Sequence, residues 1–141
     1  MKRIIRSVIV FSMLIPFLSC AQNKQNAANI VSPEQETTKA KYHKISAEKA
    51  KKMLDENQNA ILLDVRSEAE FKEKHITGAT LLPLPEIEVK AANILPDKNA
   101  LILVYCRSGK RSNNAANQLV SIGYTNVYDF GGIIDWPYET E

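Results

Sequence analysis

The stretch of this chain that most limits its fold is a run of five apolar or aromatic residues, Leu101 to Tyr105, that leads directly into Cys106. The following segment, 107–112, carries one glycine and three cationic side chains, and a helix-compatible sequence comes next. A short, continuous apolar run of this kind is typical of a buried parallel strand. The sequence therefore predicts a central strand that delivers a thiol to a basic loop at the N-terminus of a helix.

Strand and helix signals alternate along the rest of residues 41–141, with short connections between them. This alternation predicts an α/β three-layer sandwich, in which helices cover both faces of a parallel sheet of about five strands. Ligand sites in such sheets lie beyond the carboxyl ends of the strands, where Cys106 falls. We expect strands at 41–45, 60–65, 79–82, 101–105 and 126–130, helices at 47–57, 67–71, 86–94 and 111–122, and a final short helix opened by Gly131-Gly132.

The first 19 residues carry the pattern of a secretory signal peptide. Three cationic residues, Lys2, Arg3 and Arg6, precede an almost unbroken apolar run over 8–18. That run is about half the length that a membrane-spanning helix needs, which favours a cleaved leader. Without these three residues the net charge falls from +2 to −1, so the composition gives no reason to expect a nucleic-acid partner.

The leader ends in Phe17-Leu18-Ser19-Cys20-Ala21, which resembles the lipobox of bacterial lipoproteins. The resemblance implies acylation of Cys20 and an exported protein, anchored to a membrane only by its lipid and facing the periplasm or the cell exterior. An ordinary signal peptide with an unmodified cysteine is the alternative. Residues 21–40 are too polar to offset the entropy of ordering, so we expect 20–40 to be a lipidated cysteine with a flexible tether, and 41–141 to be one domain.

The loop after Cys106 is suited to holding a thiolate. Consecutive backbone N–H groups in a tight turn bind anions, the following helix presents its positive end, and Arg107, Lys110 and Arg111 add charge. Gly109 allows the backbone to turn without steric penalty. Cysteines in such settings have pKa values of about 3.5–7.5. The simpler interpretation, a buried structural cysteine with exposed charges around it, is the less favoured one.

Five motifs follow one another across residues 60–138. They are Leu62-Leu63-Asp64-Val65-Arg66 with Glu70-Phe71, Lys74-His75-Ile76-Thr77-Gly78-Ala79, Leu82-Pro83-Leu84, Cys106-Arg107-Ser108-Gly109-Lys110-Arg111-Ser112, and Gly131-Gly132 with Trp136-Pro137. In this order they resemble the motifs of a single-domain rhodanese, a sulfurtransferase of the thiosulfate:cyanide type. Lys74 departs from the pattern, because the family usually has glycine there.

The resemblance implies a two-step reaction without a metal or an organic cofactor. Cys106 is the nucleophile that takes sulfur from a small anionic donor, such as thiosulfate, and carries it as a persulfide. A thiophilic acceptor, which is cyanide, a thiol or a protein cysteine, then removes the sulfur. The residues expected to bind the substrate are Arg107, Ser108, Gly109, Lys110 and Arg111, with Arg111 the preferred anchor of the donor.

The resemblance gives Asp64 and Arg66 a supporting role, that of holding loops near the site. His75 is interpreted as structural, because a thiolate that is already formed needs no base. Trp136 is interpreted as a packing residue.

Three other functions remain open. Cysteine phosphatases and arsenate reductases also use a thiolate in an anion-binding loop, but such phosphatases place an arginine after five intervening residues, where this chain has Ser112. A non-catalytic binding module of the same fold is the second alternative. A redox protein is the third, and it usually has a second nearby cysteine; we predict no disulfide between Cys20 and Cys106.

Overall fold

The computed structural model describes residues 41–141, so the predicted signal peptide and tether lie outside the described residues. Within 41–141, no helix has the length and apolarity to cross a bilayer. The strands are β1 (His43–Lys44), β2 (Ile61–Asp64), β3 (Thr80–Leu81), β4 (Ile102–Cys106) and β5 (Val127–Gly132). The helices are α1 (Ala47–Glu56), α2 (Glu68–Glu73), α3 (Ile87–Ile94) and α4 (Lys110–Ser121), with 3₁₀ turns η1 (Leu84–Glu86) and η2 (Ile133–Asp135).

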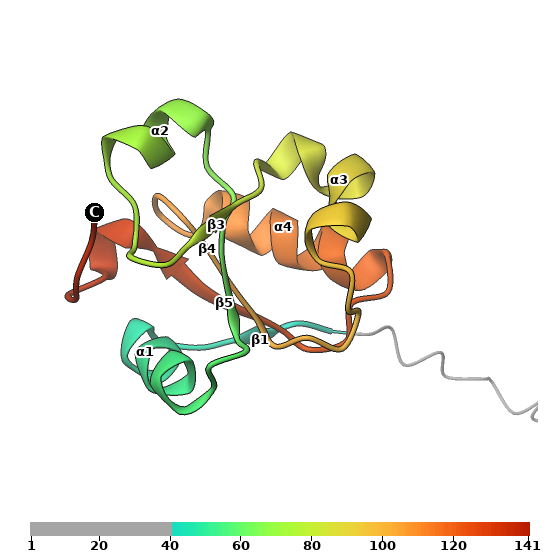
Figure 1. The fold of residues 1–141 in the computed structure, drawn as a ribbon, viewed down its shortest axis with the longest axis horizontal. Helices are drawn as coiled ribbons and strands as arrows, with labels where there is room; N and C mark the ends of the chain where they lie inside the picture. Colours follow the sequence, from blue (N-terminus) through green and yellow to red (C-terminus); the bar gives the residue numbers. More distant parts are fainter. Residues whose placement is uncertain (1–40) are drawn as a thin grey trace, which may run out of the picture. The chain divides into compact units, whose positions relative to one another are not determined.

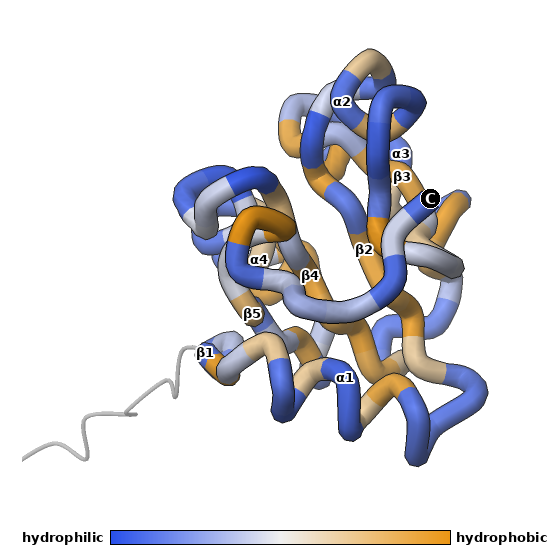
Figure 2. Tube along the Cα trace, turned by 90° about the vertical axis from the view of Figure 1, so that its left-hand side faces the viewer, coloured by the Kyte–Doolittle hydropathy of each residue, from blue (hydrophilic) through white to orange (hydrophobic). Residues whose placement is uncertain are grey.

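The five strands form one parallel sheet in the order β1-β5-β4-β2-β3. Helix α1 lies on one side of the sheet, and α3 and α4 lie on the other (Figure 1). Each side has its own apolar cluster, and β2 and β4 carry hydrophobic stretches between them (Figure 2). The predicted α/β class, with a five-stranded parallel sheet covered on both faces, is confirmed.

Strand β4 is the centre of the sheet, because it pairs with β5 on one side and β2 on the other. All five of its residues are buried. Because side chains alternate along a strand, Ile102, Val104 and Cys106 enter the cluster on the α3–α4 side. Leu103 and Tyr105 enter the cluster on the α1 side. The apolar run Leu101–Tyr105 therefore fixes the position of the cysteine, as predicted.

Helix α4 ends in a Schellman motif, which turns the chain back toward the sheet. The Gly123 N–H donates to the Val120 carbonyl at 3.1 Å, and the Tyr124 N–H donates to the Leu119 carbonyl at 3.0 Å. Gly123 adopts the left-handed conformation that this motif requires, with φ +98°. The turn buries the Tyr124 side chain, whose hydroxyl lies 2.9 Å from the Ala91 carbonyl and 2.6 Å from the Leu95 carbonyl. This contact ties α4 to the end of α3.

One predicted boundary is wrong. Gly131 and Gly132 do not open a helix; they continue β5, and the 3₁₀ turn η2 begins only at Ile133. Gly131 has φ +95° at an irregularity where the pairing passes from Val104–Asp129 to Cys106–Gly132. The extra residue on β5 is a bulge, and glycine is well suited to its left-handed backbone. A glycine pair can therefore mark either a bulge at the end of a strand or the start of a helix, and the local sequence pattern alone does not distinguish the two.

We predict that Tyr124→Phe lowers the free energy of unfolding by about 1–2 kcal/mol, because the buried carbonyl that accepts from the Tyr124 hydroxyl loses this donor. Urea unfolding followed by circular dichroism measures the change. Tyr138→Phe is the matched control, since Tyr138 is partly exposed and its hydroxyl has no hydrogen bond among residues 41–141. Equal losses in the two variants would contradict the role given to the Tyr124 hydroxyl.

Candidate active site

Cys106 is the last residue of β4, and its thiol is free and buried within residues 41–141. The loop 107–109 turns back over it, so that the Gly109 N–H donates to the Cys106 Sγ at 3.1 Å. Gly109 is the N-cap of α4, with φ +96°, a conformation that favours glycine. The sulfur therefore lies beneath the first turn of a twelve-residue helix, with the positive end of the helix toward it.

Two opposing effects act on the pKa of the Cys106 thiol. Burial raises the pKa, because it disfavours the charged thiolate. Hydrogen bonds from the backbone N–H groups of Ser112, Ser108 and Gly109 lower it, as does the Ser112 side chain, and together they outweigh burial. The pKa is therefore below its ordinary value. The main cause is the nest of backbone donors rather than the cationic side chains of the loop.

The loop rests on the end of β5. A Cβ atom on Gly132 would lie 2.3 Å from the Arg107 carbonyl oxygen and 2.7 Å from the Ser108 Cα, both of them backbone atoms of the loop. The Ser112 hydroxyl lies 3.0 Å from the Gly109 carbonyl and 3.2 Å from the Gly131 carbonyl, and it can donate to one of them at a time. Close packing and a shared hydroxyl thus hold the loop in the shape that directs its N–H groups at sulfur.

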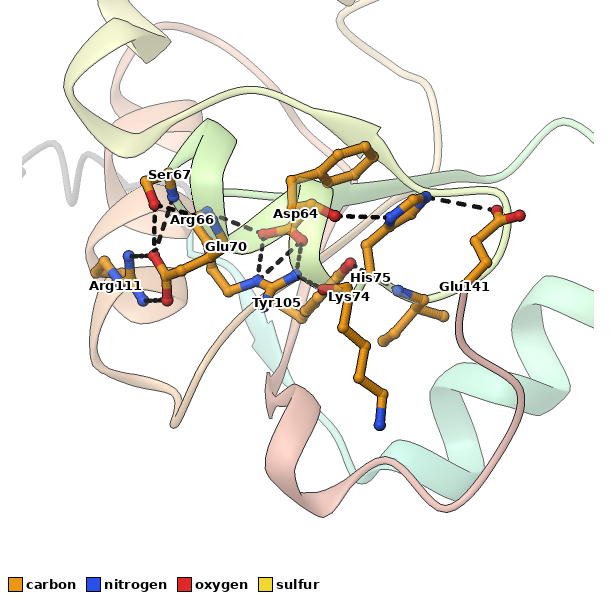
Figure 3. Close-up of polar contacts among 11 residues, drawn as sticks. Asp64, Arg66, Ser67, Glu70, Lys74, His75, Tyr105, Arg111 and Glu141 are labelled. Carbon is orange, nitrogen blue, oxygen red and sulfur yellow. Dashed lines mark hydrogen bonds and ion pairs between the residues drawn. The ribbon is translucent and has the colours of Figure 1, made fainter.

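Arg111, the residue expected to anchor the donor, is paired with Glu70 of α2. Its Nη1 and Nη2 lie 2.6 and 2.7 Å from the two carboxylate oxygens, a bidentate ion pair (Figure 3). Glu70 is itself held by a capping box with Ser67 at the start of α2. The hydrogen bond from Arg111 is the largest of the effects that lower the pKa of Glu70 to about 2. The carboxylate is therefore charged at neutral pH and occupies the guanidinium of Arg111.

Asp64 and Arg66 form a buried pair at the carboxyl end of β2. The Arg66 Nη2 lies 2.6 Å from Asp64 Oδ2 and donates to the Lys74 carbonyl at 2.7 Å (Figure 3). The Tyr105 hydroxyl accepts from the Ile76 N–H at 3.1 Å, and burial raises the pKa of Tyr105, so the phenol stays neutral. These contacts tie both ends of the segment that carries α2 to the sheet, and α2 in turn positions Glu70.

A cleft of about 460 Å³ opens between α2 and η2. Its walls contain Arg66, Glu70, Glu73 and Lys74 on one side and Arg107, Ile133 and Ile134 on the other. The cleft borders the cysteine loop through Arg107, which follows Cys106 directly. Ser108 on the same loop and Lys110, the first residue of α4, were also expected to bind substrate, and both are exposed.

His75 lies outside this arrangement. Its Nδ1 lies 2.9 Å from the Phe71 carbonyl, and its ring stacks on that of Phe71 with centroids 3.8 Å apart. The His75 backbone pairs with Glu141, and Trp136 packs in the core on the α1 side. Among residues 41–141, no cluster of three or more His, Cys, Asp or Glu side chains is placed to hold a metal ion.

The parallel sheet with a thiol at the carboxyl end of its central strand, cradled by the start of the next helix, defines an α/β protein with an anion-binding cysteine loop. The family model of the rhodanese-like domain matches residues 46–137. The chain therefore belongs to the rhodanese-like domain family, as its motifs predict.

Two curated relatives with similar sequences are named sulfurtransferases. The chain is 38% identical to the thiosulfate sulfurtransferase PspE of Escherichia coli over 73 residues, covering 52% of this chain and 70% of that protein. It is 34% identical to a sulfurtransferase of Allochromatium vinosum over 95 residues, covering 67% of this chain and 87% of that protein.

Two solved structures share the fold at moderate identity. One is described as a rhodanese with anions from E. coli, with 34% identity, a TM-score of 0.55, and coverage of 58% of this chain and 96% of that one. A rhodanese-related protein from Thermoplasma volcanium has 30% identity and a TM-score of 0.59, with coverage of 71% and 98%.

Three features of the site were not predicted from the sequence. Neither Ser112 nor Gly132 was given a role in shaping the loop, although the first holds the loop and the second leaves space for it. Glu70 was likewise noted without its partner Arg111. One sequence signal was available for Gly132. A strand bulge needs only one glycine, here Gly131, so a second adjacent glycine indicates that another backbone segment packs closely against the strand.

We predict that Gly132→Ala raises the pKa of the Cys106 thiol and lowers the free energy of unfolding by about 1–3 kcal/mol, because the new methyl group displaces the loop. The rate of alkylation by iodoacetamide as a function of pH reports the thiol pKa. Gly123→Ala is the control: its left-handed φ also makes it lose stability, but nothing lies near its Cβ position and it is remote from sulfur. An unchanged alkylation midpoint in Gly132→Ala would contradict the account of the loop.

Proposed function

We propose that this protein is a thiosulfate-type sulfurtransferase that carries sulfane sulfur on Cys106. The observation that supports this most directly is the buried Cys106 sulfur, which accepts the Gly109 N–H at 3.1 Å in a loop that lowers its pKa. A thiolate is the nucleophile in sulfur chemistry, and its formation in this loop needs no separate base. The same N–H groups stabilise the negative charge of a persulfide.

Each step breaks one bond to the transferred sulfur and forms another: an S–S bond to Cys106 in the first step, and in the second an S–S bond to a thiol or a C–S bond to cyanide. The Cys106 thiolate attacks the outer sulfur of thiosulfate, the S–S bond of the donor breaks, and sulfite leaves with the electron pair. In the second step the acceptor attacks the outer sulfur of the persulfide, and Cys106 leaves as a thiolate. Neither step needs an external oxidant or reductant, and the loop holds an anion at the start and end of each.

The positive charge around the loop supports an anionic donor. Arg107 and Lys110 are exposed and form no ion pair among residues 41–141, so both can attract an anion. Arg111 can contribute once the donor shares its guanidinium with Glu70. The names of the E. coli and A. vinosum relatives agree with sulfur transfer, and thiosulfate as the donor is part of the proposal.

We predict that incubation of the purified domain with thiosulfate adds one sulfur atom to Cys106, detected by intact-protein mass spectrometry. Cyanide should remove the added mass, and Cys106→Ala should not acquire it. Activity on a generic aryl phosphate is the parallel control for a phosphatase. An unmodified Cys106 in folded protein, or phosphatase activity that depends on Cys106, would overturn the proposed function.

We also propose that the protein is exported and anchored to a membrane by a lipid on Cys20. The support is the sequence alone: a cationic start, a short apolar run and a lipobox-like ending. Such an anchor places the sulfur chemistry in the periplasm or at the cell exterior.

We predict that the full-length protein fractionates with membranes and that Cys20→Ser releases it, because acylation of this residue is its means of attachment. The measurement is immunoblotting of membrane and soluble fractions after high-salt washing. Ser19→Ala retains the cysteine and serves as the control. A Cys20→Ser protein that stays with the membrane would rule out the lipid anchor.

A further inference from the structure

The cleft beside the cysteine loop is larger than a small inorganic donor needs. Its volume of about 460 Å³ lies within the range of about 300–1,000 Å³ that is usual for sites of organic ligands. Its wall includes Ile134, which is 65% exposed, so an apolar surface is available within it. Thiosulfate alone leaves most of this space unfilled.

The cleft borders the loop that follows Cys106. Arg107, which follows the cysteine, forms part of one wall, and the Ile134 N–H donates to the Arg107 carbonyl at 3.3 Å. Gly132, just before η2, pairs with Cys106 in the sheet. A persulfide lengthens the cysteine by about 2 Å, the length of one S–S bond. A ligand in the cleft is therefore adjacent to the loop that carries the outer sulfur.

The charges of the cleft are unequal. Arg66 is paired with Asp64, and Glu70 is paired with Arg111, so both are compensated. Lys74 and Arg107 are exposed and form no ion pair among residues 41–141, whereas Glu73 is the uncompensated acidic residue of the walls. In Figure 3 the Lys74 side chain extends away from the Asp64–Arg66 pair, which its own carbonyl contacts. The excess charge is positive.

We infer that this cleft binds the acceptor of the sulfur, and that the acceptor is a small organic thiol bearing one or more carboxylates. Its carboxylates lie against Lys74 and Arg107, its carbon skeleton contacts Ile133 and Ile134, and its sulfur reaches toward Cys106. The inference rests on the proposed function, since it concerns the second step of that reaction. Lys74 is a recognition residue in this account, and glycine, usual in the family at this position, cannot supply its charge.

The chemistry follows from this placement. The thiolate of the bound acceptor attacks the outer sulfur of the Cys106 persulfide. A new S–S bond forms on the acceptor, the bond to Cys106 breaks, and the Cys106 thiolate receives the electron pair. The products are the acceptor persulfide and the regenerated thiolate, whose charge the loop N–H groups again stabilise.

The test uses the second step alone. Cys106 is first loaded with thiosulfate and the excess donor is removed; discharge is then followed by quenched mass spectrometry with mercaptosuccinate or with monothioglycerol, a neutral thiol. The readout is the second-order rate constant for mercaptosuccinate divided by that for monothioglycerol. A general loss of activity or of folded protein affects both rate constants and cancels in this ratio. We expect Lys74→Gln to lower this ratio about two- to fivefold, the range for one exposed ionic contact.

Glu73→Gln is the matched variant that removes a negative charge, since Glu73 is the acidic residue immediately before Lys74. It should raise the ratio, and added salt should bring all three proteins closer together. A ratio that does not change in Lys74→Gln, or one that moves in the same direction in both variants, overturns the inference while leaving sulfur transfer intact. Failure to load Cys106 overturns the proposed function and the inference with it.

Discussion

The contact between the backbone N–H of Gly109 and the sulfur of Cys106 is the interaction on which the site depends. A buried thiol resists ionisation, and only donors directed at sulfur reverse that preference. Those donors belong to the backbone, so their directions are fixed by the course of the loop. The loop in turn holds its course because Gly132 lets it approach β5 and Ser112 links it to the end of that strand.

The parallel sheet explains why these elements meet. β4 is buried between β2 and β5, and the carboxyl ends of all three lie at the same edge. β4 ends in Cys106, β5 ends in the glycines beneath the loop, and β2 ends in the Asp64–Arg66 pair that holds the approach to α2. Helix α2 then presents Glu70 to Arg111 of α4. Each of these three strands thus contributes one part of the site.

Much of this arrangement follows from local sequence. The apolar run Leu101–Tyr105 predicts the central strand, and the glycine and helical pattern after Cys106 predict the loop and α4, because both signals depend on neighbouring residues. Contacts between segments that are distant in sequence could not be predicted in this way. Glu70 and Arg111 are 41 residues apart, and nothing in either segment identifies its partner. The importance of Gly132 likewise depends on a contact with backbone that is far away in sequence, and the role of Arg111 as anchor of a donor stays a prediction.

The account makes the backbone, rather than the surrounding cations, responsible for the thiolate. The most direct test is to titrate the Cys106 thiol by its ultraviolet thiolate absorbance in the folded domain and again in urea, at low and high salt. The account predicts a pKa below that of the unfolded chain and only weakly dependent on salt, because hydrogen bonds from a fixed loop are little screened. A folded-state pKa equal to or above the unfolded value, or one that rises to it at high salt, would contradict the account.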